Sequence, residues 1–411
     1  MIERLQISHL RNLTQVQLAP KACNIFIGAN GSGKTSCLEA IFLLSRGKSF
    51  RHHQPKRYIE HHQSSVTVFA SLVDGTSLAI QKQLDATTTL RFNHANVYNQ
   101  SVLTAKLPTL LIDPSSMEML EQGSSQRRQL LDWLVFHMKP GFHPQWLAYQ
   151  RLLKQRNQLL KHPKPLSSAQ LSELRSWDSG LSNHAALIDH YRRQVFEAWQ
   201  PYFQDTMAKL LPSYANQLTL SYSSGFDSSL PLAEQLSERL VQDLQLGYSR
   251  IGSHRADIHV HWRSIADEPQ GKTPDDIASV AITDSENDAE QNIANASQET
   301  IAKAKPILKE QAANVLSRGE KKLLITALKL SQLPLLLTAE LGALSATPVV
   351  LLDDITAELD DNAVKVLLST LAKLPCQIFI TSLSDEILPL IEHYWSEAQL
   401  FHVKHGQILP F

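Results

Sequence analysis

Residues 28–35 of the chain read Gly28-Ala29-Asn30-Gly31-Ser32-Gly33-Lys34-Thr35. This stretch matches the pattern G-x-x-x-x-G-K-[ST], in which glycines let backbone N–H groups wrap around nucleotide phosphates. Residues 24–27 before it are typical of a buried strand, and residues 36–44 after it are typical of a helix. The start of that helix adds the positive end of its dipole to the phosphate site. We therefore predict a P-loop, with Lys34 on the β- and γ-phosphates and Thr35 on Mg²⁺.

A second motif comes late in the chain, where the apolar run of residues 348–352 ends in Asp353 and Asp354. Such a run predicts a buried parallel strand, because both faces of a parallel sheet are covered. Its two carboxylates would then reach the nucleotide site from the end of the strand. We expect Asp353 to hold Mg²⁺ and Asp354 to orient the attacking water.

A third motif, Leu316-Ser317-Arg318-Gly319-Glu320, precedes an apolar helix over residues 321–330. Ser317 and Glu320 have the spacing of a capping box, in which each side chain bonds to the backbone of the other residue. About thirty residues before the carboxylate strand, this stretch also resembles the signature motif of ABC-type ATPases. In that class the serine and helix dipole of one subunit face the γ-phosphate bound by the other. Ser317 is thus a candidate residue acting across a dimer.

Composition is that of an ordinary globular protein: 411 residues, 43% hydrophobic and 19% charged. The three cysteines, Cys23, Cys37 and Cys376, lie in apolar segments without metal-binding spacing, which favours a reduced cytoplasmic protein. The N-terminus has no signal-peptide pattern. The most apolar stretch, residues 333–352, is broken by prolines, a glycine and a glutamate, so we predict no membrane span.

Charge is unevenly distributed along the chain. Residues 264–300 hold nine acidic residues and one lysine, a net charge of −8, whereas the whole chain carries −1 and the remainder therefore +7. We interpret about 264–304 as an acidic disordered insertion, because the segment has few apolar residues and little periodicity. The basic remainder favours a polyanionic partner.

Basic residues gather in two places that we predict to contact DNA phosphates. The first is the loop after the P-loop helix, and the second is the polar face of a predicted helix over residues 146–160. A solvated surface is the alternative for both. The candidate contacts are Arg46, Lys48, Arg51, Lys56, Arg57, Lys154 and Arg156. Arg11, at the turn between the first two predicted strands, is a candidate contact to the nucleotide.

Periodicity divides the chain into three parts: residues 1–125 and 248–411 as the two portions of an α/β ATPase head, and residues 126–247 as a helical arm lobe. Residues 65–112 read as β-structure, including a strand over 102–112. Two helical stripes between residues 143 and 202 predict an arm of two helices of some twenty-five residues each.

Together these motifs resemble the RecF family of bacterial recombination-mediator ATPases, which have an ABC/SMC-type head. The resemblance covers nearly the whole chain except about 264–310. Besides the three motifs above, it includes Leu10-Arg11-Asn12, residues 46–51, Gln126-Arg127-Arg128 with Leu131-Asp132, Gly252-Ser253-His254-Arg255-Ala256-Asp257, and Glu358-Leu359-Asp360.

The resemblance implies a weak, DNA-stimulated ATPase that dimerises around two ATP molecules and binds single-stranded DNA or single-strand/double-strand junctions. RecR and RecO are the implied partners in loading RecA during recombinational repair, replication restart and the SOS response. It also implies that Asp360 lies at the dimer seam. Two positions depart from related ATPases: Ala357 stands where a serine is common, and Thr381 stands where transport ATPases have a histidine. The acidic insertion is not typical of the family.

Other classes of P-loop protein fit the sequence less well. A transport ATPase has its signature soon after the P-loop, but here 283 residues separate Lys34 from Ser317. A chromosome-structural SMC head needs long heptad repeats, a nuclease-fused ATPase needs an acidic metal cluster after Asp360, and a GTPase needs an N-K-x-D motif. A DNA-binding module with an idle P-loop is a further alternative, as is a stand-alone ABC ATPase.

Overall fold

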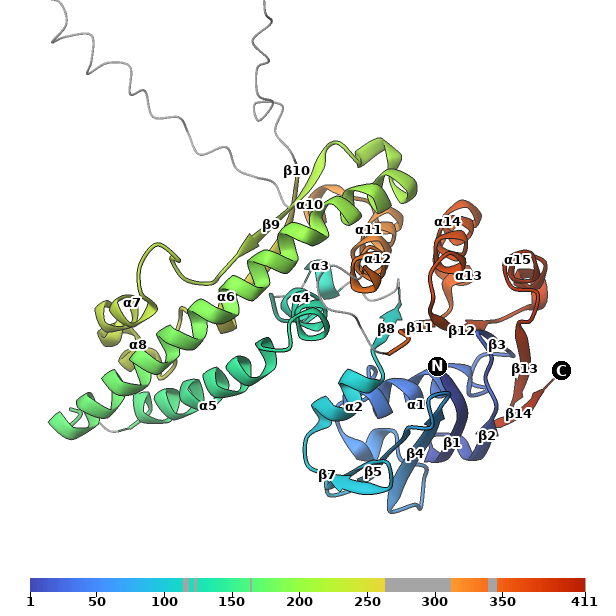
Figure 1. The fold of residues 1–411 in the computed structure, drawn as a ribbon, viewed down its shortest axis with the longest axis horizontal. Helices are drawn as coiled ribbons and strands as arrows, with labels where there is room; N and C mark the ends of the chain where they lie inside the picture. The colour runs from blue at the N-terminus through green and yellow to red at the C-terminus, as the bar shows by residue number, and fades with distance from the viewer. Residues whose placement is uncertain (114–117, 122–123, 163–164, 263–311, 339–345, 411) are drawn as a thin grey trace, which may run out of the picture.

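The computed structural model describes residues 1–411 except 114–117, 122–123, 163–164, 263–311, 339–345 and 411. The predicted acidic insertion at about 264–304 lies outside the described residues. No helix in the described part of the chain is long and apolar enough to cross a membrane. Figure 1 shows a β-rich head beside an elongated helical lobe.

The nucleotide motifs are carried by a six-stranded, mostly parallel sheet of order β14-β13-β3-β12-β11-β8. Only β14 runs antiparallel to its neighbour. The carboxyl ends of β3, β11 and β12 lie side by side, so segments more than 300 residues apart in sequence meet at one edge. The strands are β3 (Cys23–Ile27), β8 (Thr109–Ile112), β11 (Val349–Leu352), β12 (Gln377–Ser382), β13 (Gln399–Lys404) and β14 (Gln407–Pro410).

A second, antiparallel sheet of order β2-β1-β4-β5-β6-β7 covers the other side of helix α1 (Lys34–Arg46). Helix α1 contacts strands of both sheets and is buried over most of its length, which agrees with its nearly continuous apolar sequence. The sheet consists of β1 (Ile2–Leu10), β2 (Leu13–Leu18), β4 (Ser65–Leu72), β5 (Ser77–Gln83), β6 (Thr88–Phe92) and β7 (Ala95–Val97).

The predicted strand over 102–112 is correct only for its last residues, which form β8. Before it lies helix α2 (Gln100–Lys106), and Asn99 caps this helix by accepting a hydrogen bond from the Ser101 backbone N–H at 3.0 Å. Leu103 and Thr104 are buried, and α2 packs against α1. The apolar residues here therefore follow a helical period, and the Asn cap was the sequence signal for it.

The helical lobe is built on two antiparallel helices, α5 (Phe142–Leu160) and α6 (Ser168–Leu210). Helix α6 has 43 residues, so the prediction of two helices of about equal length was wrong. It continues through Pro201 and packs against helices from both the lobe and the signature region. The elements of the lobe and of the signature region beside it are α3 (Glu118–Glu121), α4 (Ser124–Met138), β9 (Leu218–Ser223), α7 (Leu232–Glu238), α8 (Leu240–Leu246), β10 (Asp257–Trp262), α10 (Ala312–Val315), α11 (Arg318–Leu330) and α12 (Gln332–Leu337).

Arg156 was predicted on a solvated helix face as a DNA contact, and the structure contradicts this. Its side chain is fully buried and donates hydrogen bonds to Asp178 at 2.6 Å and to Asp243 and Ser249 at 2.7 Å each. The guanidinium thus joins α5, α6 and α8 inside the lobe. A buried charge needs such partners, so this arginine stabilises the arm and is not available to DNA.

We expect Arg156→Met to lower the free energy of unfolding of the lobe by about 3–5 kcal/mol, because two buried carboxylates lose their cation. Lys154→Met is the matched control, since Lys154 is exposed on the same helix and should change stability by less than ~0.5 kcal/mol. Denaturant unfolding followed by circular dichroism measures both. Equal midpoints for the two variants would contradict the structural role of Arg156.

Candidate nucleotide and DNA site

The loop between β3 and α1 has the backbone geometry of a phosphate-binding turn. Gly31 and Gly33 have φ values of 77° and 120°, a region that favours glycine. A Cβ atom on Gly28 would lie 2.2 Å from the Val403 carbonyl oxygen, so only glycine fits against β13 there. The predicted P-loop residues Gly28, Ala29, Asn30, Gly31, Ser32 and Gly33 therefore occupy a tight strand-to-helix turn.

Two turns from other parts of the head hold the P-loop in place. The Asn12 side-chain amide donates to the carbonyl oxygens of Gly31 at 3.2 Å and Ser32 at 2.9 Å. From the β13–β14 turn, the Gly406 backbone N–H donates to the Ser32 carbonyl at 2.8 Å. These hydrogen bonds use carbonyl oxygens of the loop. Backbone N–H groups of the loop can therefore bind a ligand. The role of Gly406 was not predicted, because nothing in its local sequence indicates which loop the hairpin turn meets.

Lys34 lies inside the arch of the loop, as its predicted role requires. Its Nζ donates to the carbonyl oxygens of Gly28 at 2.7 Å and Ala29 at 3.1 Å, and the residue is 5% exposed. Burial lowers the pKa of Lys34, while the nearby Asp354 and Asp353 act in the opposite direction. The ammonium is thus held next to the loop by neutral acceptors and two neighbouring carboxylates, and it can turn toward a phosphate.

Thr35 and Asp353 are brought together across the sheet edge. The Thr35 hydroxyl donates to Asp353 Oδ1 at 3.0 Å, and the Thr381 hydroxyl donates to the same oxygen at 2.9 Å. Burial raises the pKa of Asp353, which the two hydroxyl hydrogen bonds partly offset. A hydroxyl and a carboxylate beside a phosphate loop are the hard oxygen ligands that Mg²⁺ prefers. The residues present therefore fit the predicted metal site.

Asp354 has an unusual backbone for a residue with a side chain. Its φ is 51°, in the left-handed region, and it directly precedes the short helix α13 (Ile355–Glu358). Its backbone N–H donates to the Thr381 hydroxyl at 2.9 Å. Its Oδ1 is buried and has no hydrogen-bond partner among the described residues. Strained residues with unsatisfied acceptors cluster at functional sites, so this geometry favours the proposed water-orienting role.

Ser317 forms the predicted capping box at the start of α11. Its hydroxyl accepts from the Glu320 backbone N–H at 3.4 Å, and Glu320 Oε2 accepts from the Ser317 N–H at 2.7 Å. Glu320 also accepts from the Tyr214 hydroxyl at 2.7 Å, which holds the cap from the lobe side. Ser317 itself is exposed. A rigid, solvent-facing helix N-terminus of this kind is suited to meet an anion from outside the chain.

Helix α11 is also connected to the carboxylate turn. Lys322 Nζ lies 2.6 Å from Glu358 Oε2, an ion pair between α11 and α13. Beyond it, Asp360 caps helix α14 (Asp361–Ala372) by accepting from the Ala363 N–H at 2.8 Å, and Ala357 is exposed. That Asp360 and Ala357 lie at a dimer seam stays a prediction.

Arg11 lies beside the P-loop helix, but its guanidinium is occupied. Its Nη2 donates to Glu39 Oε1 at 2.9 Å, and its Nε donates to the other oxygen of the same fully buried carboxylate. Glu39 also accepts from the Ser49 hydroxyl, whose oxygen accepts the Arg51 and His52 backbone N–H groups at 3.0 Å each. This network connects α1 to the basic loop that follows it, residues 47–53. A contact between Arg11 and the nucleotide stays a prediction.

The remaining DNA candidates separate into groups in space. Arg46, Lys48 and Arg51 line neighbouring cavities between head and lobe. Lys56 and Arg57 are exposed on the short turn of Pro55–Arg57, and Lys56 borders a different, smaller hollow beside Glu60. Lys154 is exposed on α5. Contacts of these residues with DNA stay predictions, and Arg156 is excluded.

Comparison with known proteins matches residues 1–396 to the family described as RecF/RecN/SMC N terminal domain. "DNA replication and repair protein RecF" of Acinetobacter baylyi is 38% identical over 409 residues, which cover 99% of this chain and 99% of the relative. The Pseudomonas aeruginosa protein of the same name (strain PAO1) is 33% identical over 414 residues, covering 99% of this chain and 97% of its own length. The chain belongs to the RecF family.

Solved structures agree with the fold of a RecF-family ATPase head. A structure described as the recombination mediator protein RecF-ATP in the RecFOR pathway superposes with a TM-score of 0.76 at 21% identity, covering 100% of this chain and 99% of that one. An Smc head bound to the C-winged helix domain of ScpA superposes with a TM-score of 0.52 at 14% identity, covering 100% and 97%. The expectation of an ABC/SMC-type head with an added helical lobe is thereby confirmed.

The remaining RecF-family motifs prove to be the connection between α4 and the β10 region. Arg127 donates to both carboxylate oxygens of Asp257 at 2.9 and 2.8 Å, and Arg128 donates to the Ala256 carbonyl at 2.8 Å. Asp132 accepts two hydrogen bonds from Arg192, at 2.8 and 3.0 Å. Bidentate pairs of this kind fix relative orientation. These motif residues therefore position the lobe, a role that the sequence pattern alone did not indicate.

Proposed function

We propose that the chain is an ATP-dependent DNA-binding protein of recombinational repair and replication restart. In this proposal two copies close around two ATP molecules, bind single-stranded DNA or junctions, and act with RecO and RecR to load RecA, including during SOS induction. Two similarities support it: the Acinetobacter baylyi relative is named a DNA replication and repair protein, and the solved RecF-ATP structure is of a recombination mediator in the RecFOR pathway. We place the protein in the cytoplasm, where its three free, buried thiols stay reduced.

One observation carries the proposal: among the described residues, no hydrogen bond links the exposed cap at Ser317 to the P-loop of its own chain. Lys34, Thr35 and Asp353 converge on the loop, whereas the described hydrogen bonds of the exposed Ser317 hydroxyl are local to its own helix cap. An anion held by the P-loop of a second copy would meet that cap and satisfy its free N–H groups. ATP binding would thus drive dimerisation, and the basic surfaces of two heads would act together on DNA.

The residues of the site fit ATP and Mg²⁺ in this account. When bound, Mg²⁺ would neutralise phosphate charge, with Thr35 and Asp353 as its protein ligands. Lys34 would bind the β- and γ-phosphates, and the Asp354 carboxylate would orient a water. We expect slow turnover that increases when DNA stabilises the closed dimer.

The proposal is tested by measuring binding to gapped, single-stranded and duplex oligonucleotides with ATP, with ADP and without nucleotide. We expect ATP to raise affinity for the gapped and single-stranded forms, and light scattering to report a dimer with ATP only. Equal affinities under all nucleotide conditions would indicate a DNA-binding module with an idle P-loop. Fast turnover without DNA binding would favour a stand-alone ABC ATPase.

A further inference from the structure

The capping box at the start of α11 has a third partner, which comes from the helical lobe. The Tyr214 hydroxyl donates to Glu320 Oε1 at 2.7 Å, while Glu320 Oε2 accepts from the Ser317 backbone N–H at 2.7 Å. Both oxygens of one carboxylate are therefore in use, one in the cap and one in the contact with the lobe. Tyr214 ends the short 3₁₀ turn of Pro212–Tyr214, which follows the long helix α6.

The phenol ring of Tyr214 is itself held in place. The Tyr214 backbone N–H donates to the Leu211 carbonyl at 3.0 Å, and its carbonyl accepts from the Gln217 N–H at 2.9 Å. The ring packs edge-on against Trp262 of β10, with the ring centroids 5.5 Å apart. The hydroxyl is thus presented to Glu320 from a fixed position. Phenylalanine would keep the ring contact and remove only the hydroxyl.

No cation takes the place of this hydroxyl at the Glu320 carboxylate. The two lysines that follow Glu320 are paired elsewhere: Lys321 Nζ lies 3.0 Å from Glu121 Oε1, and Lys322 Nζ lies 2.6 Å from Glu358 Oε2. Across the described residues, no lysine, arginine or histidine forms an ion pair with Glu320. The carboxylate is held by hydroxyl and backbone donors.

A second capping box in the chain shows that a third partner is not needed for capping. At the start of α6, Ser167 and Gln170 form the same reciprocal pair. In the described part of the chain, the Gln170 side chain bonds only to the Ser167 N–H, at 2.9 Å. A neutral glutamine therefore completes such a box by itself. The contact of Tyr214 with the box at α11 calls for another role.

That role follows from the charge at the start of α11. The N–H groups of Arg318 and Gly319 have no intrahelical acceptor, so they attract an anion. A freely moving Glu320 carboxylate would bring negative charge beside them and repel a phosphate group. The pKa of Glu320 is lowered, chiefly by the hydrogen bond from Tyr214 and next by the Ser317 cap. These bonds therefore stabilise the charged carboxylate in its turned-back position.

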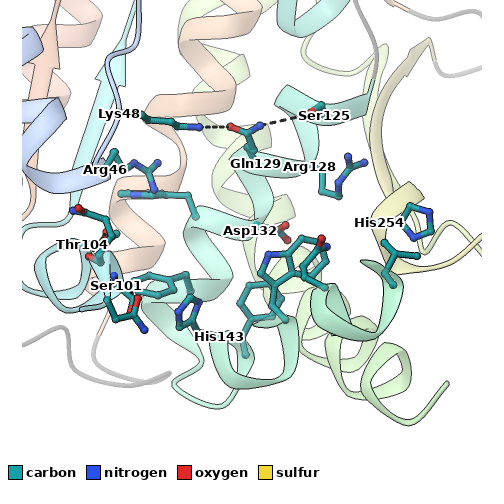
Figure 2. Close-up of a pocket in the computed structure, with 18 of the residues that line it drawn as sticks. Arg46, Lys48, Ser101, Thr104, Ser125, Arg128, Gln129, Asp132, His143 and His254 are labelled. Carbon is teal, nitrogen blue, oxygen red and sulfur yellow. Dashed lines mark hydrogen bonds between the residues drawn. The ribbon is translucent and has the colours of Figure 1, made fainter. Parts of the chain in front are cut away.

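We propose that Tyr214 is a positioning residue for the Ser317 cap: its hydroxyl holds the Glu320 carboxylate on the Ser317 backbone and keeps the start of α11 open to a phosphate bound by a second copy. The inference rests on the proposed function, in which Ser317 meets ATP on the other copy. Tyr214 lines neither large cavity between head and lobe; Figure 2 shows one of them, with Arg46 and Arg128 among its lining residues. A Tyr214 variant therefore leaves that basic surface unchanged.

The role is tested with Tyr214→Phe. Light scattering with ATP should show dimerisation weakened by about 4- to 100-fold, because each dimer contains two caps and one such hydrogen bond changes an equilibrium by about 2- to 10-fold. A fluorescent ATP analogue, at protein concentrations too low for dimerisation, should bind with unchanged affinity. Tyr222→Phe is the matched control. It loses a hydroxyl that donates to Asp189 at 2.8 Å in the same lobe, and it should dimerise as the unmodified chain does.

Glu320→Gln separates positioning from simple stabilisation. Glutamine keeps a capping box, as Gln170 does at α6, but removes the charge that would repel phosphate. In this background the further change Tyr214→Phe should weaken dimerisation by less than about twofold. A merely structural contact would instead cost as much as it does in the unmodified chain. Thermal melting by circular dichroism checks that Tyr214→Phe, Tyr222→Phe, Glu320→Gln and the double variant are folded.

Two results would overturn the inference while the proposed function stands. One is dimerisation of Tyr214→Phe with ATP as tight as that of Tyr222→Phe, under conditions where Ser317→Arg does not dimerise. The other is an equal loss on removing the Tyr214 hydroxyl with and without Glu320→Gln, which would make Tyr214 a structural contact only. If the unmodified chain does not dimerise with ATP, the proposed function fails and the inference fails with it.

Discussion

Lys34→Met is expected to weaken ATP binding by roughly 10- to 160-fold, the equivalent of losing one hydrogen bond to a charged group, and to abolish ATP-dependent DNA binding. The Lys34 ammonium lies inside the arch of the loop, where a bound phosphate would accept its hydrogen bonds. Each hydrogen bond to a charged group contributes about 1.5–3 kcal/mol to the free energy of binding. The fold should survive, because Lys34 Nζ donates only to two loop carbonyls and methionine removes a buried charge while keeping a similar volume.

Lys21→Met serves as the control, since Lys21 is exposed just before β3 and loses the same charge. Titration calorimetry with ATP measures affinity, and thermal melting by circular dichroism checks the fold of both variants. We expect Lys21→Met to bind ATP as the unmodified chain does. Unchanged ATP affinity in Lys34→Met, together with unchanged nucleotide stimulation of DNA binding, would show that the loop does not act as a P-loop.

Ser317→Arg is expected to leave ATP binding to the monomer nearly intact while abolishing the ATP-induced dimer. In the proposed dimer the Ser317 hydroxyl and the first N–H groups of α11 approach the γ-phosphate on the other copy, and a bulky side chain blocks that approach. Loss of the cap itself should lower stability by only about 1 kcal/mol.

The chain contains a matched control for this variant. Ser167 caps α6 with the same kind of reciprocal box, through Gln170, and is also exposed. Ser167→Arg should therefore cost a similar free energy of unfolding, yet dimerise with ATP normally. Light scattering with and without ATP compares the two variants. Equal behaviour of both would mean that Ser317 is only a helix cap.

The arrangement of the candidate nucleotide site could be predicted because its residues are specified by local rules. Each motif has a local physical cause that is visible in the sequence. Glycine permits positive φ, an apolar run that ends in Asp353 forms a buried parallel strand, and the spacing of Ser317 and Glu320 forms a capping box. The P-loop and Asp353 then come together because the carboxyl ends of parallel strands lie at the same edge of the sheet. The motif residues around Arg127 and Asp257 were recognised by resemblance, and only the structure showed that they pair with each other.

Predictions failed where tertiary contacts decide the outcome. Arg156 and Lys154 lie two residues apart and look equivalent in sequence, but one is fully buried because Asp178 and Asp243 come from distant helices. Residues 102–106 were predicted as part of a strand, yet the Asn99 cap and packing on α1 make them part of helix α2. One cavity between head and lobe, lined by Arg46 and Lys48, combines residues from α1, α2, α4 and α5, so no single stretch of sequence indicates it.

The central claim, that each ATP is held between the P-loop of one copy and Ser317 of the other, is tested most directly by mixing two inactive variants. Lys34→Met retains Ser317, and Ser317→Arg retains the P-loop, so a mixed dimer contains one complete site and each homodimer contains none. With one variant affinity-tagged, we predict ATP-dependent co-purification of the pair, although neither variant alone associates with ATP. Absence of association in the mixture, under conditions where the unmodified chain dimerises with ATP, would contradict the shared site.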